Sequence, residues 1–142
     1  MKKLLIAIAV ILSSSQAFAA GEVLKLDTKG VEYCRGAKPL AFNQSNDLEF
    51  WIRIDSSTAA SIYADADTTM LVSRLSLSTQ ALTDRTSSFV AFSGNSINFF
   101  SAVGTLGYDE SGDIKTIKAN VIRKGVFNSC YSRAKVTGKR VN

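Results

Sequence analysis

The residue types that carry most enzyme chemistry are scarce in this chain. It has no histidine and only two cysteines, Cys34 and Cys130. No segment has the spacing of a phosphate-binding loop, a nucleophile elbow or a zinc motif. Without histidine, neither Ser-His-Asp nor Cys-His nucleophilic sites can form, and the commonest metal ligand is missing. We therefore expect a protein that is not an enzyme and that uses no cofactor and no metal.

Two acidic clusters could be read as chemical sites. Asp65 and Asp67 stand one residue apart, as in half of a calcium loop, but no glutamate follows at the spacing of an EF-hand. Asp109, Glu110 and Asp113 surround a glycine, which is typical of a turn between two strands. We interpret the first cluster as a solvated loop and the second as a hairpin turn.

Glu49 and Asp55 are the one carboxylate pair that could be drawn on a single strand face. In a straight strand that rises about 3.3 Å per residue they lie roughly 20 Å apart. Retaining and inverting glycosidases both need a much shorter separation of their two carboxyl groups. The pair therefore gives no support to glycoside hydrolysis.

The two cysteines predict one disulfide, Cys34–Cys130, which would tie the end of the chain to its beginning. In the chain-entropy model, a crosslink that closes a loop of about 100 residues stabilises the fold by about 4–5 kcal/mol. A link between the first and last strands also suits a closed sheet.

Basic residues are concentrated at the C-terminal end of the sequence. Residues 114–142 hold eight of the 17 lysines and arginines and none of the 12 acidic residues. Such a basic ribbon could meet phosphates, acidic lipid headgroups or an acidic protein; alternatively, its bases face water or pair with acids of neighbouring strands. The candidate contacts to an anionic surface are Lys115, Lys118, Arg123, Lys124, Arg133 and Lys135, followed by Lys139 and Arg140.

Four phenylalanines, Phe89, Phe92, Phe99 and Phe100, fall on both faces of one predicted hairpin. A strand that is apolar on both faces either has a covered outer layer or carries an apolar patch that binds something. We expect one face of this hairpin to be core, and parts of Phe92 and Phe100 to be exposed.

The first 19 residues have the pattern of a bacterial export signal. Lys2 and Lys3 precede an apolar run over residues 4–12, and Ala17-Phe18-Ala19 forms a small-x-small cleavage site. The apolar run is about half of the roughly 20 residues that a spanning helix needs. We therefore predict a signal peptide over 1–19, a single domain over 20–142 without a transmembrane span, and a periplasmic or secreted location.

The remaining chain predicts an all-β fold. Residues 48–55 alternate strictly, with Leu48, Phe50, Ile52 and Ile54 on one face, which is typical of a strand with one solvated face. Further strand patterns recur, separated by Gly, Asn, Asp and Ser, and residues 79–85 are the best candidate for a short helix. Short consecutive hairpins favour an antiparallel up-and-down meander that forms a small closed or nearly closed barrel of about eight strands. A two-sheet β-sandwich is the alternative.

The segment VEYCRGAKPLAF, residues 31–42, resembles the tyrosine-cysteine start of small periplasmic lysozyme-inhibitor barrels. The loop motif that those inhibitors insert into the enzyme has no counterpart in this sequence. The resemblance is confined to these residues and does not assign the family.

Together these features predict a non-catalytic exported barrel that binds a small apolar ligand or presents a surface to an envelope partner, such as an anionic component or another protein. The alternative is a protein-inhibitor module that acts through an exposed loop such as 81–88. Nothing in the pattern favours nucleic acid.

Overall fold

The computed structural model describes residues 21–43, 49–94, 98–125 and 129–141. The predicted signal peptide lies outside these residues. Among the residues described, no helix is long and apolar enough to cross a membrane. Over these described ranges the secondary structure consists of nine β-strands: β1 (Val23–Cys34), β2 (Leu40–Asn43), β3 (Phe50–Ser56), β4 (Ala59–Tyr63), β5 (Leu71–Thr83), β6 (Thr86–Gly94), β7 (Asn98–Tyr108), β8 (Ile114–Gly125) and β9 (Cys130–Arg140).

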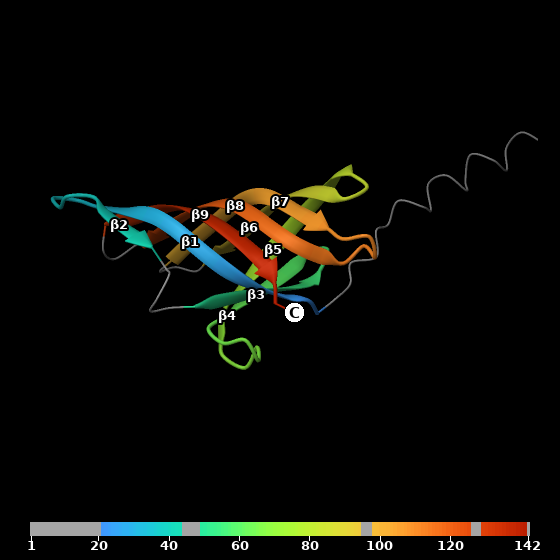
Figure 1. The fold of residues 1–142 in the computed structure, drawn as a ribbon. Helices are drawn as coiled ribbons and strands as arrows, with labels where there is room; N and C mark the ends of the chain where they lie inside the picture. The colour runs from blue at the N-terminus through green and yellow to red at the C-terminus, as the bar shows by residue number, and fades with distance from the viewer. Residues whose placement is uncertain (1–20, 44–48, 95–97, 126–128, 142) are drawn as a thin grey trace, which may run out of the picture.

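The strands form one antiparallel sheet that closes on itself as a barrel (Figure 1). Consecutive strands from β3 to β9 are neighbours, and β9 returns to pair with β1 from Leu24↔Arg140 to Cys34↔Cys130. Eight strands close the ring, and β2 is an additional short strand. The predicted closed meander is therefore confirmed, and the sandwich alternative is wrong.

Strand β1 pairs with three other strands, because it is longer than its neighbour β3. Only its first residues, Val23–Leu26, pair with β3. Farther along, Lys29–Glu32 pair with β2 on the side that β3 has left. An uncovered stretch of β1 would expose unpaired N–H and C=O groups, so β2 satisfies an edge that would otherwise invite association.

The predicted helix over residues 79–85 is wrong. Strand β5 continues through this segment and pairs with β6 as far as Thr83↔Thr86. The hydroxyls of Thr83 and Thr86 lie 2.7 Å apart across the tight turn. β-Branched threonines and a cross-strand partner at nearly every position favour a strand over an isolated turn of helix.

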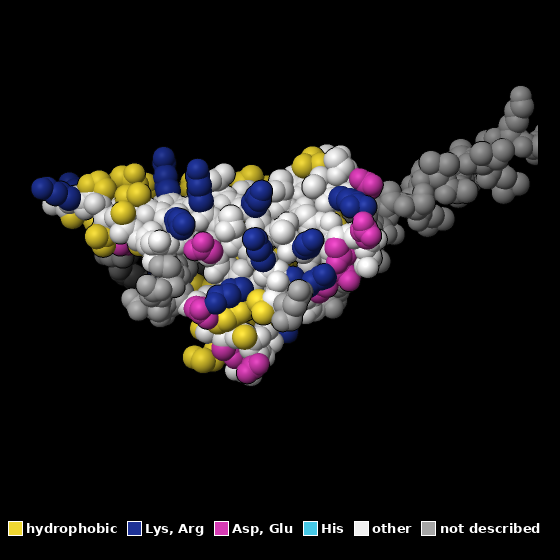
Figure 2. All heavy atoms as spheres, viewed as in Figure 1, with side chains coloured by type: hydrophobic (Ala, Val, Ile, Leu, Met, Phe, Trp, Pro, Cys, Tyr) yellow, Lys and Arg dark blue, Asp and Glu magenta, His cyan; other side chains and the backbone are white. Residues whose placement is uncertain are grey.

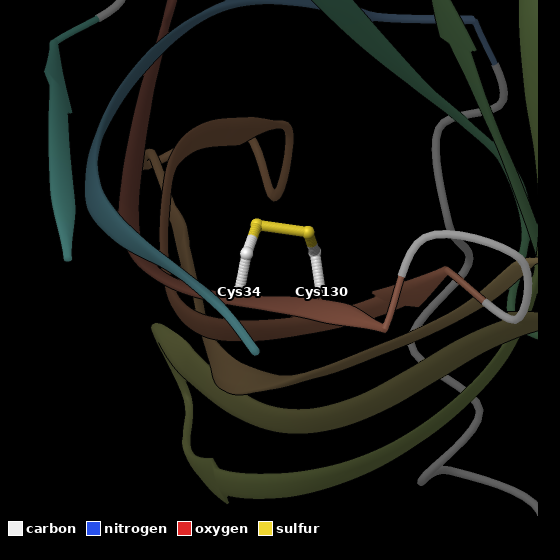
Figure 3. Close-up of a disulfide and its surroundings, with 2 residues drawn as sticks. All are labelled: Cys34 and Cys130. Carbon is white, nitrogen blue, oxygen red and sulfur yellow. A yellow bond between two sulfur atoms is a disulfide. The ribbon is translucent and has the colours of Figure 1, made fainter. Parts of the chain in front are cut away.

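The two ends of the barrel differ. Leu24, Ile54, Leu106 and Ile114 are fully buried where the chain enters β1 and leaves β9. We call this the packed end. The opposite end carries the Cys34–Cys130 disulfide, and we call it the disulfide end. The predicted bridge is confirmed, with Cα atoms 4.1 Å apart (Figure 3).

Candidate ligand-binding cavity

The barrel contains a cavity of about 740 Å³ that opens to solvent where the exposed side chains of Leu40 and Phe99 line it. Its walls come from inward-facing side chains of all nine strands and are predominantly apolar, with Phe50, Ile62, Leu75 and Phe89 among the larger ones. A β-strand sends alternate side chains to opposite faces, so each strand gives the lumen every second residue. The cavity lies beyond the large core residues of the packed end.

Small side chains keep the middle of the barrel open. In one cross-strand row, Gly30, Ala134, Val121, Ala102 and Ala91 are successive partners on β1, β9, β8, β7 and β6. The alanines carry little volume into the lumen, whereas the Phe42 ring of β2 packs over Gly30. In an eight-stranded barrel, side chains of ordinary size would fill the interior, so the space follows from this row.

A polar row crosses the lumen nearer the disulfide end. Glu32, Ser132, Arg123, Phe100 and Ser93 follow one another on β1, β9, β8, β7 and β6. Neither Glu32 nor Arg123 has an ion-pair partner within 4.0 Å among the described residues. Both line the cavity. Most of the lumen is therefore apolar. At its disulfide end, the positive Arg123, the neutral Ser132 and the negative Glu32 lie side by side.

The disulfide lies beside this row. Figure 3 shows the bridge spanning from the end of β1 to the start of β9. The Glu32 carboxylate lies within 4.8 Å of both sulfurs, and this is the one group of three potential metal-ligating residues found in the described part of the chain. The sulfurs are bonded to each other and are not thiolates, so this grouping does not make a cysteine metal site.

One base, Arg140, bridges the carboxylates at the packed end. Arg140 donates to Glu22 and to Asp109, each at 2.8 Å. The pKa of Asp109 is lowered because the backbone N–H of Asp113 donates to its carboxylate and because Arg140 lies against it. This cluster fastens the last strand to the β7–β8 turn, as predicted for a structural turn.

The other acidic candidates also have structural contacts. Asp65 accepts hydrogen bonds from Thr69 and from the backbone N–H of Met70, which lowers the pKa of its carboxyl. Glu49 pairs with Lys25, whereas Asp55 pairs with Arg53. Glu49 and Asp55 therefore contact different bases, which leaves the glycosidase pairing without support.

The predicted basic contacts divide between the two faces of the barrel wall. Arg123 lines the lumen. Lys118, Lys124, Arg133 and Lys135 are exposed and have the opposite strand parity, so they lie outside. Lys115 is exposed near the start of β8. For the described residues, Arg140 is the member of the 114–142 set that has a carboxylate within 4.0 Å.

The four phenylalanines also divide. Phe89 is buried, and Phe100 is partly buried against the core. Phe92 is 52% exposed on the outer face; Phe99 is 47% exposed, has the outward strand parity of its partner Lys124, and also lines the mouth of the cavity. The loop proposed for inhibition, 81–88, is the tight β5–β6 hairpin, and its residues 81–85 are exposed. The inhibitor alternative stays a prediction.

The sequence analysis predicted a barrel that binds a small apolar ligand, but it did not identify the residues that line the lumen. It grouped Arg123 with Lys124 although adjacent strand residues face opposite sides, and it did not select Glu32 or Ser132. The alternation in residues 118–124 separates Ala119, Val121 and Arg123 from their neighbours, and this could have identified an inward arginine. No family model, curated protein or solved structure matches this chain.

Proposed function

We propose that this protein binds a small, elongated apolar molecule inside its barrel and acts as a non-catalytic carrier or receptor for it. The observation that supports this proposal is the cavity of about 740 Å³ with predominantly apolar walls. Pockets of roughly 300–1,000 Å³ that bury most of a small ligand are typical binding sites. Removing an apolar chain from water supplies about 0.8 kcal/mol per buried methylene.

The polar row suggests the chemistry of one end of the ligand. Arg123, which has no ion-pair partner among the described residues, suits an anionic group such as a carboxylate, with the neighbouring Ser132 hydroxyl as a second donor. Glu32, on the other side of Ser132, disfavours a second negative charge. We therefore propose an amphiphile with an apolar chain and a single anionic end, held with that end toward the disulfide.

The proposed location is the periplasm or the exterior of the cell. The Cys34–Cys130 disulfide is compatible with an oxidising compartment. The 1–19 pattern is the second support. Intact mass of the protein recovered from the cell envelope tests this, with a mature chain that begins at Ala20 as the expected result.

Filling the lumen tests the binding proposal. Ala91 and Ala102 are cross-strand partners, both nearly fully buried, and both line the cavity. The variant Ala91→Phe/Ala102→Phe should bind a fluorescent long-chain fatty acid at least tenfold more weakly, because two rings occupy the space of the chain. The control is Thr105→Phe, which adds a ring to the exposed outer face of β7.

Circular dichroism and thermal unfolding show whether each variant keeps the barrel. Native mass spectrometry of the untreated protein detects a molecule that copurifies with it. If the filled variant is folded and binds the fatty acid as tightly as the wild type, the ligand is not in the lumen. If the wild type binds no apolar probe at all, the carrier function is wrong.

A further inference from the structure

The outer wall of the barrel carries a cluster of four basic residues. Lys29 of β1 is the cross-strand partner of Lys135 on β9, and Arg133 and Lys124 lie one and two rows closer to the disulfide end. All four are exposed. No carboxylate of a described residue lies within 4.0 Å of any of them.

The cross-strand rows through these bases contain no acidic residue. From β1 to β6 the rows read Lys29–Lys135–Asn120–Val103–Val90 and Val31–Arg133–Ile122–Ser101–Phe92, and the last reads Tyr33–Tyr131–Lys124–Phe99. The next outward acid on β1 is Asp27, one row farther from the disulfide end. Figure 2 shows Lys and Arg side chains spread over the wall formed by β1, β8 and β9.

The same rows become apolar where they reach β6 and β7. Val90, Phe92, Phe99, Val103 and Ile122 are each between 47% and 56% exposed. Val90 and Val103 are direct partners, while Phe92 and Phe99 lie on the disulfide-end side of this pair. Soluble surfaces normally scatter such residues, and a contiguous group marks a contact site.

Two aromatic side chains lie among the basic residues, on β1 and β9. Tyr33 and Tyr131 stack with ring centroids 5.0 Å apart. The Arg133 guanidinium lies 5.8 Å from the Tyr131 ring. Aromatic residues beside lysine and arginine are typical of the membrane–water interface, where rings enter the headgroup layer and bases meet anionic lipids.

We propose that this docking face, the basic group Lys29, Lys124, Arg133 and Lys135 with the adjoining apolar group, binds the surface of an anionic lipid bilayer. Charge complementarity selects the bilayer: the face carries four bases with no carboxylate of a described residue within 4.0 Å and with one acid, Asp27, in the adjoining row, and its apolar part can enter the headgroup layer. The face lies at the end of the barrel where the polar row lies. Docking would therefore bring the ligand-binding lumen next to the membrane.

Flotation of the protein with vesicles tests docking without any lumen ligand. The expected result is binding to vesicles of phosphatidylglycerol mixed with phosphatidylcholine, and little binding to phosphatidylcholine alone. Each basic residue near an anionic surface contributes about a fivefold factor, so Arg133→Gln/Lys135→Gln should lower the partition coefficient about 25-fold. Raising salt from about 0.1 to 1 M should release most of the wild type.

Two further variants separate charge from apolar contact. Lys115→Gln/Lys139→Gln removes two exposed bases nearer the packed end and should leave binding close to that of the wild type. Phe92→Ser/Phe99→Ser should weaken binding about 25-fold, since about half of each ring is left to bury. All variants are prepared with the same N-terminus. Any effect of residues 1–19 on vesicle binding is therefore the same in each of them.

The proposal is wrong if folded Arg133→Gln/Lys135→Gln binds anionic vesicles as the wild type does, or if the Lys115/Lys139 control loses as much. Equal binding to neutral vesicles also overturns it. So does binding to polyglutamate that is as tight as binding to vesicles and indifferent to the phenylalanine variant, because that result indicates a general polyanion site. Fatty-acid binding by the lumen is measured separately and does not affect these outcomes.

Discussion

The Cys34–Cys130 disulfide offers a prediction whose size follows from the topology. The bridge joins directly paired residues at the end of the β1–β9 ladder. Replacing both cysteines by alanine removes the crosslink but leaves the ladder from Leu24↔Arg140 onward. We therefore expect a barrel that still folds and is substantially less stable.

The magnitude comes from the loop that the bridge closes. The cysteines are 96 residues apart in sequence. Removing a crosslink over about 100 residues returns about 4–5 kcal/mol of chain entropy to the unfolded state. The total free energy of unfolding of a small domain is about 5–15 kcal/mol. The variant should therefore remain folded, with a smaller free energy of unfolding.

Urea unfolding followed by tryptophan fluorescence measures this loss. Trp51 is the single tryptophan and is buried, so its emission reports unfolding. With a slope of about 2 kcal/mol per molar urea, the midpoint should fall by about 2 M. Reduced wild type has the same open loop and both sulfurs, so its midpoint should match that of Cys34→Ala/Cys130→Ala.

A loss below about 1 kcal/mol in both reduced protein and double variant would refute the chain-entropy reasoning. A double variant much less stable than reduced wild type would place the effect in lost contacts of the sulfur atoms at the disulfide end. If the slope of the urea titration changes and its midpoint does not, the variant has altered the unfolded ensemble.

Three other predictions concern the lumen, the packed end and the wall. Arg123→Gln should weaken binding of a long-chain carboxylate about tenfold and should leave binding of the matching alcohol unchanged. The effect is near the lower end expected for a charged hydrogen bond, because Arg123 is exposed. Lys124→Gln, on the outer face, is the control in the same titration. The Asp109 carboxyl has a lowered pKa, so its stabilisation is present above the unfolded value of about 3.9 and is lost as pH falls through the folded value; the difference in Tm between wild type and Asp109→Asn should be full above about pH 5 and shrink below pH 4. Gly104→Ala should lower the free energy of unfolding by about 1–3 kcal/mol in urea, because a Cβ there would lie 2.0 Å from the Lys118 backbone oxygen, whereas Ser101→Ala on the outer face should change it little.

Alternation in the sequence predicted the strands well and their exposure less well. Ile52 and Ile54 are buried, as the pattern of residues 48–55 indicates. Trp51 was expected on a solvated face, but it is buried although it faces outward. Its register partners Lys25 and Tyr63 flank it, and the Lys25 ammonium lies 5.9 Å from its ring. Cover of this kind comes from strands distant in sequence, which a local pattern does not reveal.

The cavity could not be predicted because it depends on register and barrel radius. Ala91, Ala102 and Ala134 lie far apart in the sequence and look like ordinary strand residues. Only the pairing of β6 to β9 and β1 places them in one row. A shift by one residue would turn each strand's inward set outward, so the empty lumen is a property of the closed sheet.

The charge imbalance of residues 114–142 was visible in the sequence, but whether it would be neutralised depended on topology. Arg140 is neutralised because β1, the β7–β8 turn and the end of β9 meet at the packed end, where Glu22 and Asp109 are within reach. Lys124, Arg133 and Lys135 lie on β8 and β9. Their cross-strand partners on the neighbouring strands β7 and β1 are Phe99, Val31 and Lys29, which are apolar or basic. An up-and-down order keeps the last strands next to one another, so bases that are close in sequence stay close in space. The ladder that closes the barrel then adds Lys29 from the first strand to the same face, and the closure that builds the lumen also concentrates the positive charge outside it.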